Sequence, residues 1–459
     1  MEWYILTSPK VLSGSPTKKT DASFPPGKAR PWSVDHRIPP GPENKYDTSE
    51  DLLVWMDRQF RAYGDIYKAS AYGANIYAVR APEYAQHVLR KNWQNYPKGQ
   101  AIKRIALLLG SGLMVSEGEL WKTQRRMIQP AFHRSAICTL TDVITKANVA
   151  LCERWERAAQ AKQKVNVTRD ISLMVLDVVL IALFGADHEL AKSRFALLSD
   201  EPARNLQFAQ EFRSLGKFVV ELAADRRRRN QRSTDILGIL MEARDRETGQ
   251  PMSNQQMGNE ILTLVVAGHE TTASTLNWAW YLLSQHPHVE DKLSREIARV
   301  PVSDVPSLDD LPRFAYTRQV LEETLRLYPA GWLMTRRALK DDQLGDYFVP
   351  AGTEIYVPPY FIQRHPALWQ APDQFDPERF DPARPEKPHP LATLPFSAGP
   401  RNCIGELLAR VEMQIHLMIT AKRLRLRYED KAQPEMEAGV NLRSKHDFVM
   451  IPELKRPAH

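Results

Sequence analysis

The chain is organised around one short loop, Phe396-Ser397-Ala398-Gly399-Pro400-Arg401-Asn402-Cys403-Ile404-Gly405, which leads into an amphipathic run that ends near residue 422. Gly399 and Gly405 flank the cysteine, so the backbone can turn tightly and approach a large flat ligand where a β-carbon would collide. Arg401 lies two residues before the cysteine, and Phe396 offers an apolar cover. A thiolate near amide groups and positive charge is stabilised against protonation and can bind a metal ion. The loop predicts a metal site with Cys403 as ligand, and a buried free thiol is the alternative.

A second motif lies in the middle of a long predicted helix. Ser253 opens a capping box with Gln256, and no proline follows before Pro287, so one helix of about 33 residues and roughly 50 Å is expected. Its middle reads Ala267-Gly268-His269-Glu270-Thr271-Thr272. The glycine weakens the helix and clears space beside it, and a threonine hydroxyl can bond back to a carbonyl. The acid at 270 and the hydroxyl at 271 can then relay protons to a bound ligand.

Two alternatives exist for this helical motif. A zinc site of the type His-Glu-x-x-His is excluded, because Ala273 stands where the second histidine would be. A buried helix with satisfied polar groups remains open.

Two charged pairs lie on other predicted helices. Trp121 and Arg125 are four residues apart, so an indole N–H and a guanidinium share a face and can both donate to a carboxylate. A core tryptophan on an amphipathic helix is the alternative there. Glu323 and Arg326 are three residues apart, which on an exposed helix is an ordinary ion pair of roughly 0.2–0.5 kcal/mol.

The cysteine loop resembles the haem-binding loop of the cytochromes P450, Phe-x-x-Gly-x-Arg-x-Cys-x-Gly. The motif at 267–272 is similar to that family's oxygen-activation motif, (Ala/Gly)-Gly-x-(Asp/Glu)-Thr-(Thr/Ser). The Glu323–Arg326 pair recurs in the family with a later arginine, which Arg379 provides here. The resemblance covers residues 47 to 451 and implies a mainly α fold with a small β lobe. Residues 47–459 would form a single haem domain of the soluble, bacterial type.

The resemblance also implies roles for individual residues. Haem b is expected between the long helix and the cysteine loop, with Cys403 as the axial ligand of the iron. Glu270 and Thr271 are expected to deliver protons to bound O2. Glu323, Arg326 and Arg379 would form a buried triad that fixes the cysteine loop. The other expected haem contacts, with the propionate-binding residues first, are Trp121, Arg125, Arg336, Arg401, Phe396, Gly399, Gly405, Ala267 and Gly268.

The implied activity is that of a monooxygenase, which uses O2 and two electrons from NAD(P)H to insert one oxygen atom into its substrate. Apolar residues at 105–109 and 332–334 favour an apolar substrate such as a fatty acid, a terpenoid or a carotenoid-like molecule. A haem-thiolate peroxygenase or isomerase is an alternative, against which the intact Glu270–Thr271 pair argues. A haem-binding sensor or carrier without turnover is the alternative from another class.

Composition bears on partners and location. The 459 residues include 62 basic and 55 acidic side chains, and no long basic run suggests nucleic acid. Three scattered cysteines favour a reducing compartment, so a cytoplasmic location is expected. The protein is also expected to be a monomer. The apolar run at residues 1–6 is shorter than the roughly 20 residues of a membrane span. No span is expected, and residues 1–46, rich in proline, serine and lysine, are expected to form an extended arm.

Electrons are expected from a separate acidic ferredoxin or flavodoxin with its reductase, because the chain shows no flavin or iron–sulfur module. Lys122 and Arg126 would receive this partner beside the propionates. The stretch from Gly185 to Arg226 is short for the helices that roof the pocket in the family, so either the roof is abbreviated or residues are missing there. The basic run from Arg226 to Arg229 is expected to be a solvated helix end.

The remaining predicted elements form the small β lobe and the closing strands. A helix is expected from about 51 to 63, followed by paired strands at 66–70 and 75–79 around Gly73. Two strands are expected around the Pro-Ala-Gly turn in residues 346–357, and two more at 424–428 and 448–451.

Overall fold

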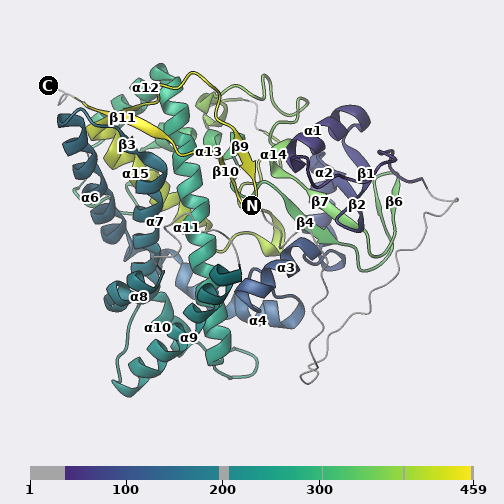
Figure 1. The fold of residues 1–459 in the computed structure, drawn as a ribbon, viewed down its shortest axis with the longest axis horizontal. Helices are drawn as coiled ribbons and strands as arrows, with labels where there is room; N and C mark the ends of the chain where they lie inside the picture. Colours follow the sequence, from purple (N-terminus) through teal and green to yellow (C-terminus); the bar gives the residue numbers. More distant parts are fainter. Residues whose placement is uncertain (1–36, 196–205, 302, 386–387, 456–459) are drawn as a thin grey trace.

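The computed structural model describes residues 37–195, 206–301, 303–385 and 388–455. Most of the predicted arm and residues 196–205 of the predicted short roof lie outside these ranges. A large helical body and a smaller β lobe lie side by side, with α11 (Asn254–Gln285) running through the body (Figure 1). This arrangement confirms the predicted fold class.

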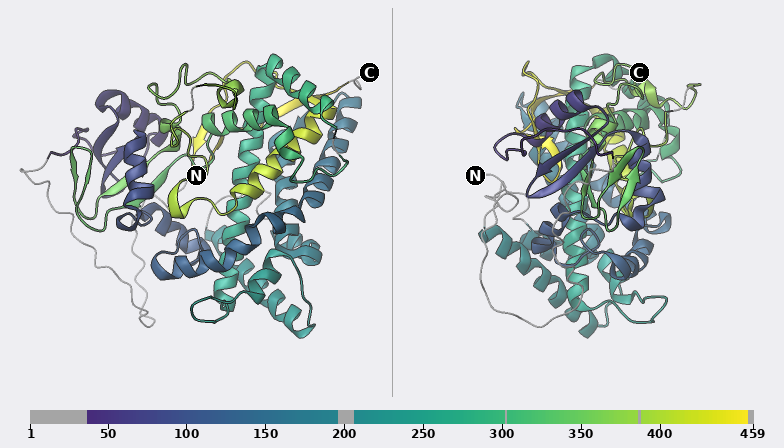
Figure 2. Two further views of the ribbon diagram at one scale, coloured as in Figure 1. Left: turned by 180° about the vertical axis from the view of Figure 1, so that it is seen from behind. Right: turned by 90° about the vertical axis from the view of Figure 1, so that its right-hand side faces the viewer.

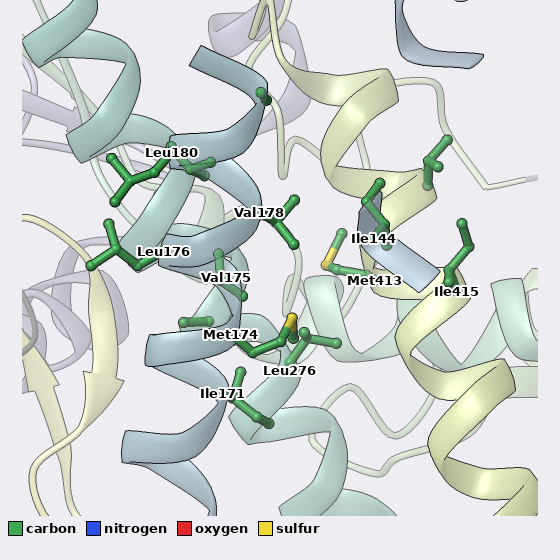
Figure 3. Packing of buried hydrophobic residues seen from close by; sticks show 14 of the residues in the cluster. Ile144, Ile171, Met174, Val175, Leu176, Val178, Leu180, Leu276, Met413 and Ile415 are labelled. Carbon is green, nitrogen blue, oxygen red and sulfur yellow. The ribbon is translucent and has the colours of Figure 1, made fainter. Parts of the chain in front are cut away.

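Four helices form the centre of the body: α6 (Thr141–Gln160), α7 (Val167–Phe184), α11 and α15 (Glu406–Arg423). The sequence of α7 is apolar on nearly all sides after its first turn, as expected for a helix enclosed by others. Figure 3 shows Met174 of α7, Leu276 of α11 and Met413 of α15 in one buried cluster. This packing holds α11 and α15, which carry the two main sequence motifs, in the same core.

The long helix α11 begins where the sequence predicted it. The Ser253 side chain accepts a hydrogen bond from the Gln256 backbone N–H at 3.2 Å, which satisfies one of the free N–H groups of the first turn. The helix runs for 32 residues and ends before Pro287, where α12 (Pro287–Arg299) begins.

The β lobe contains a four-stranded sheet in the order β1 (Ile66–Ala71), β2 (Ala74–Val79), β7 (Glu354–Val357), β4 (Met334–Arg337). The predicted pairing of the first two strands is confirmed, with Ile66 opposite Val79. Strand β7 runs parallel to β2, and Arg336 of β4 lies opposite Ile355 of β7. The two strands predicted in 346–357 exist, but they pair with different partners: β6 (Tyr347–Val349) pairs with β5 (Asp342–Leu344).

The described end of the predicted arm packs on this lobe. The Tyr46 backbone N–H donates to the Ser70 carbonyl at 2.9 Å, and the Pro40 carbonyl accepts from Lys68 at 2.9 Å. The Tyr46 ring lies 5.0 Å from the Trp55 ring of α1 (Leu52–Tyr63). These contacts cover the free edge of β1, which reduces the exposure of unpaired backbone groups.

The remaining elements surround these two parts. The predicted closing strands pair as β8 (Leu424–Arg427) and β11 (Val449–Leu454), and a hairpin of β9 (Met436–Ala438) and β10 (Leu442–Ser444) precedes the latter. The shortest strand, β3 (Val165–Asn166), pairs with β11. The other α-helices are α2 (Pro82–Gln86), α3 (Gln100–Leu109), α4 (Gly118–Ile128), α5 (Arg134–Cys138), α8 (His188–Phe195), α9 (Leu206–Arg228), α10 (Ile236–Glu242), α13 (Ala315–Leu327) and α14 (Pro359–Ile362).

The expected solvated end of α9 is confirmed for Arg227, Arg228 and Arg229, which are exposed, and is wrong for Arg226. Arg226 is not solvated: its guanidinium is buried and pairs with Asp187 at 2.7 Å and with Asp235 at 2.8 Å. The acids come from segments on either side of α9 in the sequence, so a run of arginines alone did not reveal this site.

One stretch of the described residues, 134–160, is long and apolar enough to cross a membrane by length and composition. It comprises α5 and α6, and Leu151, Cys152 and Trp155 of α6 are buried in the protein core. A helix enclosed in a core has the same composition, so this finding is weak evidence for a span.

Candidate functional site

The cysteine loop joins the β lobe to the helical body, and Figure 2 shows from behind how it leads into α15. Its two ends are tied by a hydrogen bond from the Cys403 N–H to the Phe396 carbonyl at 2.8 Å. Gly399 has a φ of +74°, and a β-carbon there would lie 2.0 Å from the Leu89 carbonyl oxygen. Glycine is therefore required at 399 by close packing against a neighbouring protein segment, which corrects the expected approach to a ligand.

The other flanking glycine differs. A β-carbon at Gly405 would meet only Phe132 at 3.8 Å and the Cys403 sulfur at 3.9 Å, which are ordinary contact distances. Protein packing therefore does not require this glycine. Because glycine has no side chain, Gly405 leaves the space next to the Cys403 sulfur uncrowded.

The environment of Cys403 does not by itself stabilise the thiolate. Burial raises the pKa of the Cys403 thiol, and hydrogen bonds from the backbone N–H groups of Gly405 and Glu406 and the charge of Arg125 lower it without cancelling that effect. The predicted stabilisation by the loop is present but is outweighed. The residue nevertheless retains exposed surface, so a metal ion can reach the sulfur and displace its proton.

Arg125 fixes the backbone next to the cysteine. Its guanidinium donates to the Asn402 carbonyl at 2.7 Å and to the Asn402 side-chain oxygen at 3.1 Å. Phe396, at the start of the loop, lies under the Arg410 guanidinium at 4.7 Å. Both arginines thus hold the loop in place, from α4 and from α15.

The predicted propionate-binding residues come together at one place. The Arg401 guanidinium lies over the Trp121 ring at 5.2 Å and the Trp93 ring at 4.9 Å, and it pairs with Glu117. Burial and, as a smaller cause, the nearby charge of Arg401 together lower the pKa of Arg336 to about 10. A β-bridge between Lys98 and Arg336 adds Lys98 to this group of residues.

Three of these cations lack an acidic partner. Within the ranges that the structure describes, the side-chain nitrogens of Lys98, Arg125 and Arg336 have no carboxylate oxygen within 4.0 Å. Arg401 pairs with Glu117, whose carboxylate also accepts a hydrogen bond from the Lys98 backbone N–H at 2.7 Å. The Lys98 ammonium donates only to the carbonyls of residues 113 and 116, both at 2.8 Å, and burial lowers its pKa to about 7. Buried charges without partners are costly. The cluster is therefore suited to an anionic ligand.

Two polar side chains of the α11 motif, Glu270 and Thr271, have defined hydrogen bonds. The Thr271 hydroxyl donates to the Ala267 carbonyl at 2.7 Å, as predicted, while the helix continues without a break. The Glu270 carboxylate accepts a hydrogen bond from the Asn441 side chain at 2.9 Å. Both residues are half-buried, so they can reach a ligand in the interior.

Gly268 has a different role from the one expected. A β-carbon at this position would lie 3.3 Å from a methyl carbon of Val179 on α7. The glycine lets α7 approach α11 closely, and the space beside it is filled by protein. His269 also faces α7, where its Nε2 atom lies 2.9 Å from the Ser172 hydroxyl.

The predicted triad is confirmed. Arg326 donates two hydrogen bonds to the Glu323 carboxylate, at 2.6 and 2.8 Å, and Arg379 donates a third at 3.3 Å. All three side chains are buried. Both guanidinium groups also donate to loop carbonyls between residues 363 and 374, so the triad fixes the path of the chain before the cysteine loop.

Sequence reasoning missed three residues of the site: Lys98, Glu117 and Asn441. Each lies far in sequence from its partner, since Lys98 meets β4, Glu117 meets Arg401, and Asn441 meets α11. Local spacing therefore carried no signal for them.

The surface expected to meet the electron donor is less available than predicted. Arg126 pairs with Asp245 at 3.0 Å and Glu247 at 2.8 Å, and Lys122 pairs with Glu119 at 2.6 Å. A hollow of about 480 Å³ opens instead beside the cysteine loop. Its lining includes Arg90, Pro395, Phe396, Asn402, Glu406 and Arg410.

Residues 44–211 and 195–453 match the family model described as Cytochrome P450. The chain is 33% identical over 389 residues to cyclooctatin synthase of Streptomyces melanosporofaciens, covering 80% of this chain and 84% of that protein. It is 31% identical over 438 residues to cyclooctat-9-en-7-ol 5-monooxygenase of the same organism, covering 90% and 93%. The solved haem domain of cytochrome P450DA is similar in fold, with a TM-score of 0.80 at 24% identity over 92% of this chain and 98% of that chain.

Proposed function

This chain belongs to the cytochrome P450 family and is a haem monooxygenase, and we propose that it oxygenates a terpenoid-like alkene or alkenol. Relatives at 33% and 31% identity support the family and the reaction class.

The site fits haem on two independent observations. Cys403 is a free thiol with exposed surface, which suits a single axial ligand to iron. Lys98, Arg125 and Arg336 are cations without carboxylate partners among the described residues, and the two propionates of haem would supply the missing negative charge. When bound, haem supplies the redox chemistry of O2 activation. The protein would hold it through Cys403 and this cation cluster.

We propose that Glu270 and Thr271 move protons toward the reacting oxygen. The hydroxyl of Thr271 is oriented by its bond to the Ala267 carbonyl, which leaves the hydroxyl oxygen free to accept a proton. Glu270 lies on the adjacent position of α11 and is half-buried, so its carboxylate can exchange protons with the interior. The main support for this role is the hydrogen bond that orients the Thr271 hydroxyl.

The coupling of NADPH consumption to product tests that role. Thr271→Ala should still bind substrate and accept electrons, but it should divert electrons to hydrogen peroxide because the proton relay is interrupted. Thr271→Ser keeps a hydroxyl and serves as the matched control, with coupling close to the parent. Equal coupling in Thr271→Ala and the parent would contradict the proposed role.

The apolar wall of the site supports a hydrocarbon-rich substrate. Leu109 of α3 is buried and Ile105 and Leu108 pack against the same core, while Leu333 and Met334 are half-buried near β4. The relative named cyclooctat-9-en-7-ol 5-monooxygenase oxygenates an alkenol according to its name. The name of this relative supports a terpenoid-like substrate over a fatty acid.

A substrate titration distinguishes these classes. Cyclic terpenoid alkenes and their mono-alcohols should change the haem absorption spectrum at low micromolar concentration, and straight-chain fatty acids should require higher concentrations. Tighter binding of fatty acids would overturn the substrate proposal while leaving the reaction class intact.

We propose that a separate acidic ferredoxin or flavodoxin docks over the hollow beside the cysteine loop. Arg90 lies at its rim, is exposed, and has no ion pair within the part of the chain that the structure describes. Lys91 follows it and is also exposed. Arg90→Glu with Lys91→Glu should slow the first electron transfer at low ionic strength and converge with the parent at high salt. Lys122→Glu with Arg126→Glu, already paired within the chain, should have the smaller effect.

A cytoplasmic location remains our proposal. Its support is that Cys138, Cys152 and Cys403 are all free thiols, as expected in a reducing compartment. Labelling of the protein in intact cells with a thiol reagent, followed by mass spectrometry, tests whether Cys138, which is exposed, stays reduced.

A further inference from the structure

The Glu270 carboxylate receives a hydrogen bond from outside its own helix. Asn441, at the tip of the β9–β10 hairpin, donates from Nδ2 to Glu270 Oε2 at 2.9 Å. We propose that Asn441 is a positioning residue that orients Glu270 for proton delivery and links this orientation to the segment 330–334, whose residues 332–334 are predicted to line the substrate pocket. The inference rests on the proton role proposed above for Glu270.

The hairpin holds Asn441 in a defined place. Strands β9 and β10 pair antiparallel, with Leu442 opposite Ala438, and the Gly439 N–H donates to the Asn441 carbonyl at 3.1 Å. Only three residues, 439–441, connect the strands. A short closed turn restricts the backbone of Asn441, so its amide group is offered to α11 in one direction.

A second bond ties the same hairpin to the same face of α11. The Ser274 hydroxyl donates to the Leu442 carbonyl at 2.7 Å, and Ser274 is buried. Glu270 and Ser274 are four residues apart, so they lie on one face, about one turn from each other. Two bonds one turn apart fix the hairpin tip along α11 and prevent it from rotating away from Glu270.

Two further bonds connect the hairpin to the substrate-lining segment. The Leu442 N–H donates to the Ala330 carbonyl at 3.0 Å, and the Trp332 indole N–H donates to the Gly439 carbonyl at 2.9 Å. The tip thus bridges the acid of α11 and the segment predicted to line the substrate pocket. A displacement of that segment by substrate would change the placement of Asn441, and with it the direction of the Glu270 carboxylate.

An asparagine suits this role chemically. Its amide N–H donates at all physiological pH values and does not compete for the proton that Glu270 transfers. The adjacent His269 faces the other way, toward Ser172 of α7, and burial lowers its pKa, which keeps the imidazole neutral. Asn441 is therefore the group outside α11 that the described contacts assign to the Glu270 carboxylate.

The test measures coupling, peroxide and substrate affinity in the haem-loaded enzyme with its electron donor. Asn441→Ala removes the donor, and Asn441→Asp keeps the shape but replaces the donor with an acceptor. Both should lower product per NADPH by roughly tenfold, with a matching rise in peroxide and a larger solvent isotope effect on product formation. Substrate affinity should stay within about twofold, which a merely structural role would not predict. Unchanged coupling in Asn441→Asp, which preserves packing, would overturn the proposal.

Two further variants separate the possible failures. Arg443→Ala removes an exposed ion pair with Glu437 on the same hairpin and should behave like the parent. Glu270→Gln should uncouple the enzyme, and adding Asn441→Ala to it should have no further effect. If Glu270→Gln alone leaves coupling unchanged, the proposed proton role fails. If Glu270→Gln uncouples the enzyme but Asn441→Ala leaves coupling unchanged, only the positioning role of Asn441 fails.

The link to substrate has its own variant. Trp332→Phe deletes the indole donor to Gly439 and retains most of the aromatic volume. It should reduce coupling in the same direction as Asn441→Ala, by a smaller factor, in the presence of substrate. Parent-like coupling in Trp332→Phe would refute the link between the substrate-lining segment and Glu270.

Discussion

Replacing Arg336 with methionine should have two effects of opposite sign: it should stabilise the haem-free protein and weaken haem binding. The guanidinium is buried on β4, and its one hydrogen bond given by the structure goes to the carbonyl of Thr335 at 2.9 Å. Burial lowers the pKa of Arg336 to about 10, against an ordinary value of about 12.5. Both values lie above neutral pH, so the side chain is charged at pH 7 in the folded and unfolded states alike.

The magnitude follows from that difference in pKa. Since each pKa unit corresponds to about 1.36 kcal/mol, the charged side chain costs the haem-free fold roughly 3 kcal/mol at neutral pH. Methionine is apolar and of similar length, so it removes this cost while retaining most of the packing. Haem relieves the same cost in the parent, because a propionate neutralises the buried charge. Haem affinity in Arg336→Met should therefore fall by roughly 3 kcal/mol, which is on the order of 100-fold.

Denaturant unfolding of the haem-free protein and haem transfer to a scavenging globin measure the two effects. Arg337→Met is the matched control, because residue 337 follows on the same strand, where alternate side chains point to opposite faces. It should leave haem retention unchanged. If Arg336→Met destabilises the haem-free protein, or retains haem as well as the parent, the assignment of the unpaired cation cluster to the propionates is wrong.

Three other outcomes are expected. Glu323→Gln should destabilise the protein by about 3–5 kcal/mol in denaturant unfolding, because Arg326 and Arg379 would keep buried charges without a carboxylate; a loss below about 1 kcal/mol would contradict the buried triad. Burial lowers the pKa of Lys98 to about 7, so between pH 7 and about 10 the unfolded chain binds more protons than the folded one, and the stability of the haem-free protein should rise with pH. Lys98→Met should flatten this rise, and a pH dependence equal to that of the parent would refute it. Cys403→Ser should abolish the thiolate-type absorption spectrum of the reduced carbon monoxide complex, and an unchanged spectrum would exclude Cys403 as the axial ligand.

The local patterns of the sequence predicted the elements well. Ser253 and Pro287 bounded the long helix because a side-chain cap and a missing N–H act within one turn of where they occur. The strands at 66–71 and 74–79 were predictable because their pairing is joined by a tight turn at Gly73. The cysteine loop was recognisable because its glycines, arginine and cysteine lie within ten residues.

The sequence predicted where the important residues lie in the chain better than it predicted which atoms they contact. Gly399 was expected to face a ligand, but it meets the Leu89 carbonyl, and Gly268 meets Val179 of α7. A glycine in a sequence shows that space is short, and only the fold shows which atoms approach. The pKa of Cys403 was equally hard to predict from the sequence. Burial raises it more than the nearby backbone N–H groups, which the sequence indicated, lower it.

The sequence by itself determined the family, the cysteine proposed as the axial ligand and the helix that carries Glu270 and Thr271, because each depends on residues close together in the chain. Tertiary structure alone decided which charges meet. It brought Lys98 beside Arg336, paired Arg126 with Asp245, and placed Asn441 against Glu270. Electrostatic interactions depend on distance and burial in space, and residues more than a hundred positions apart carry no local pattern that records either quantity.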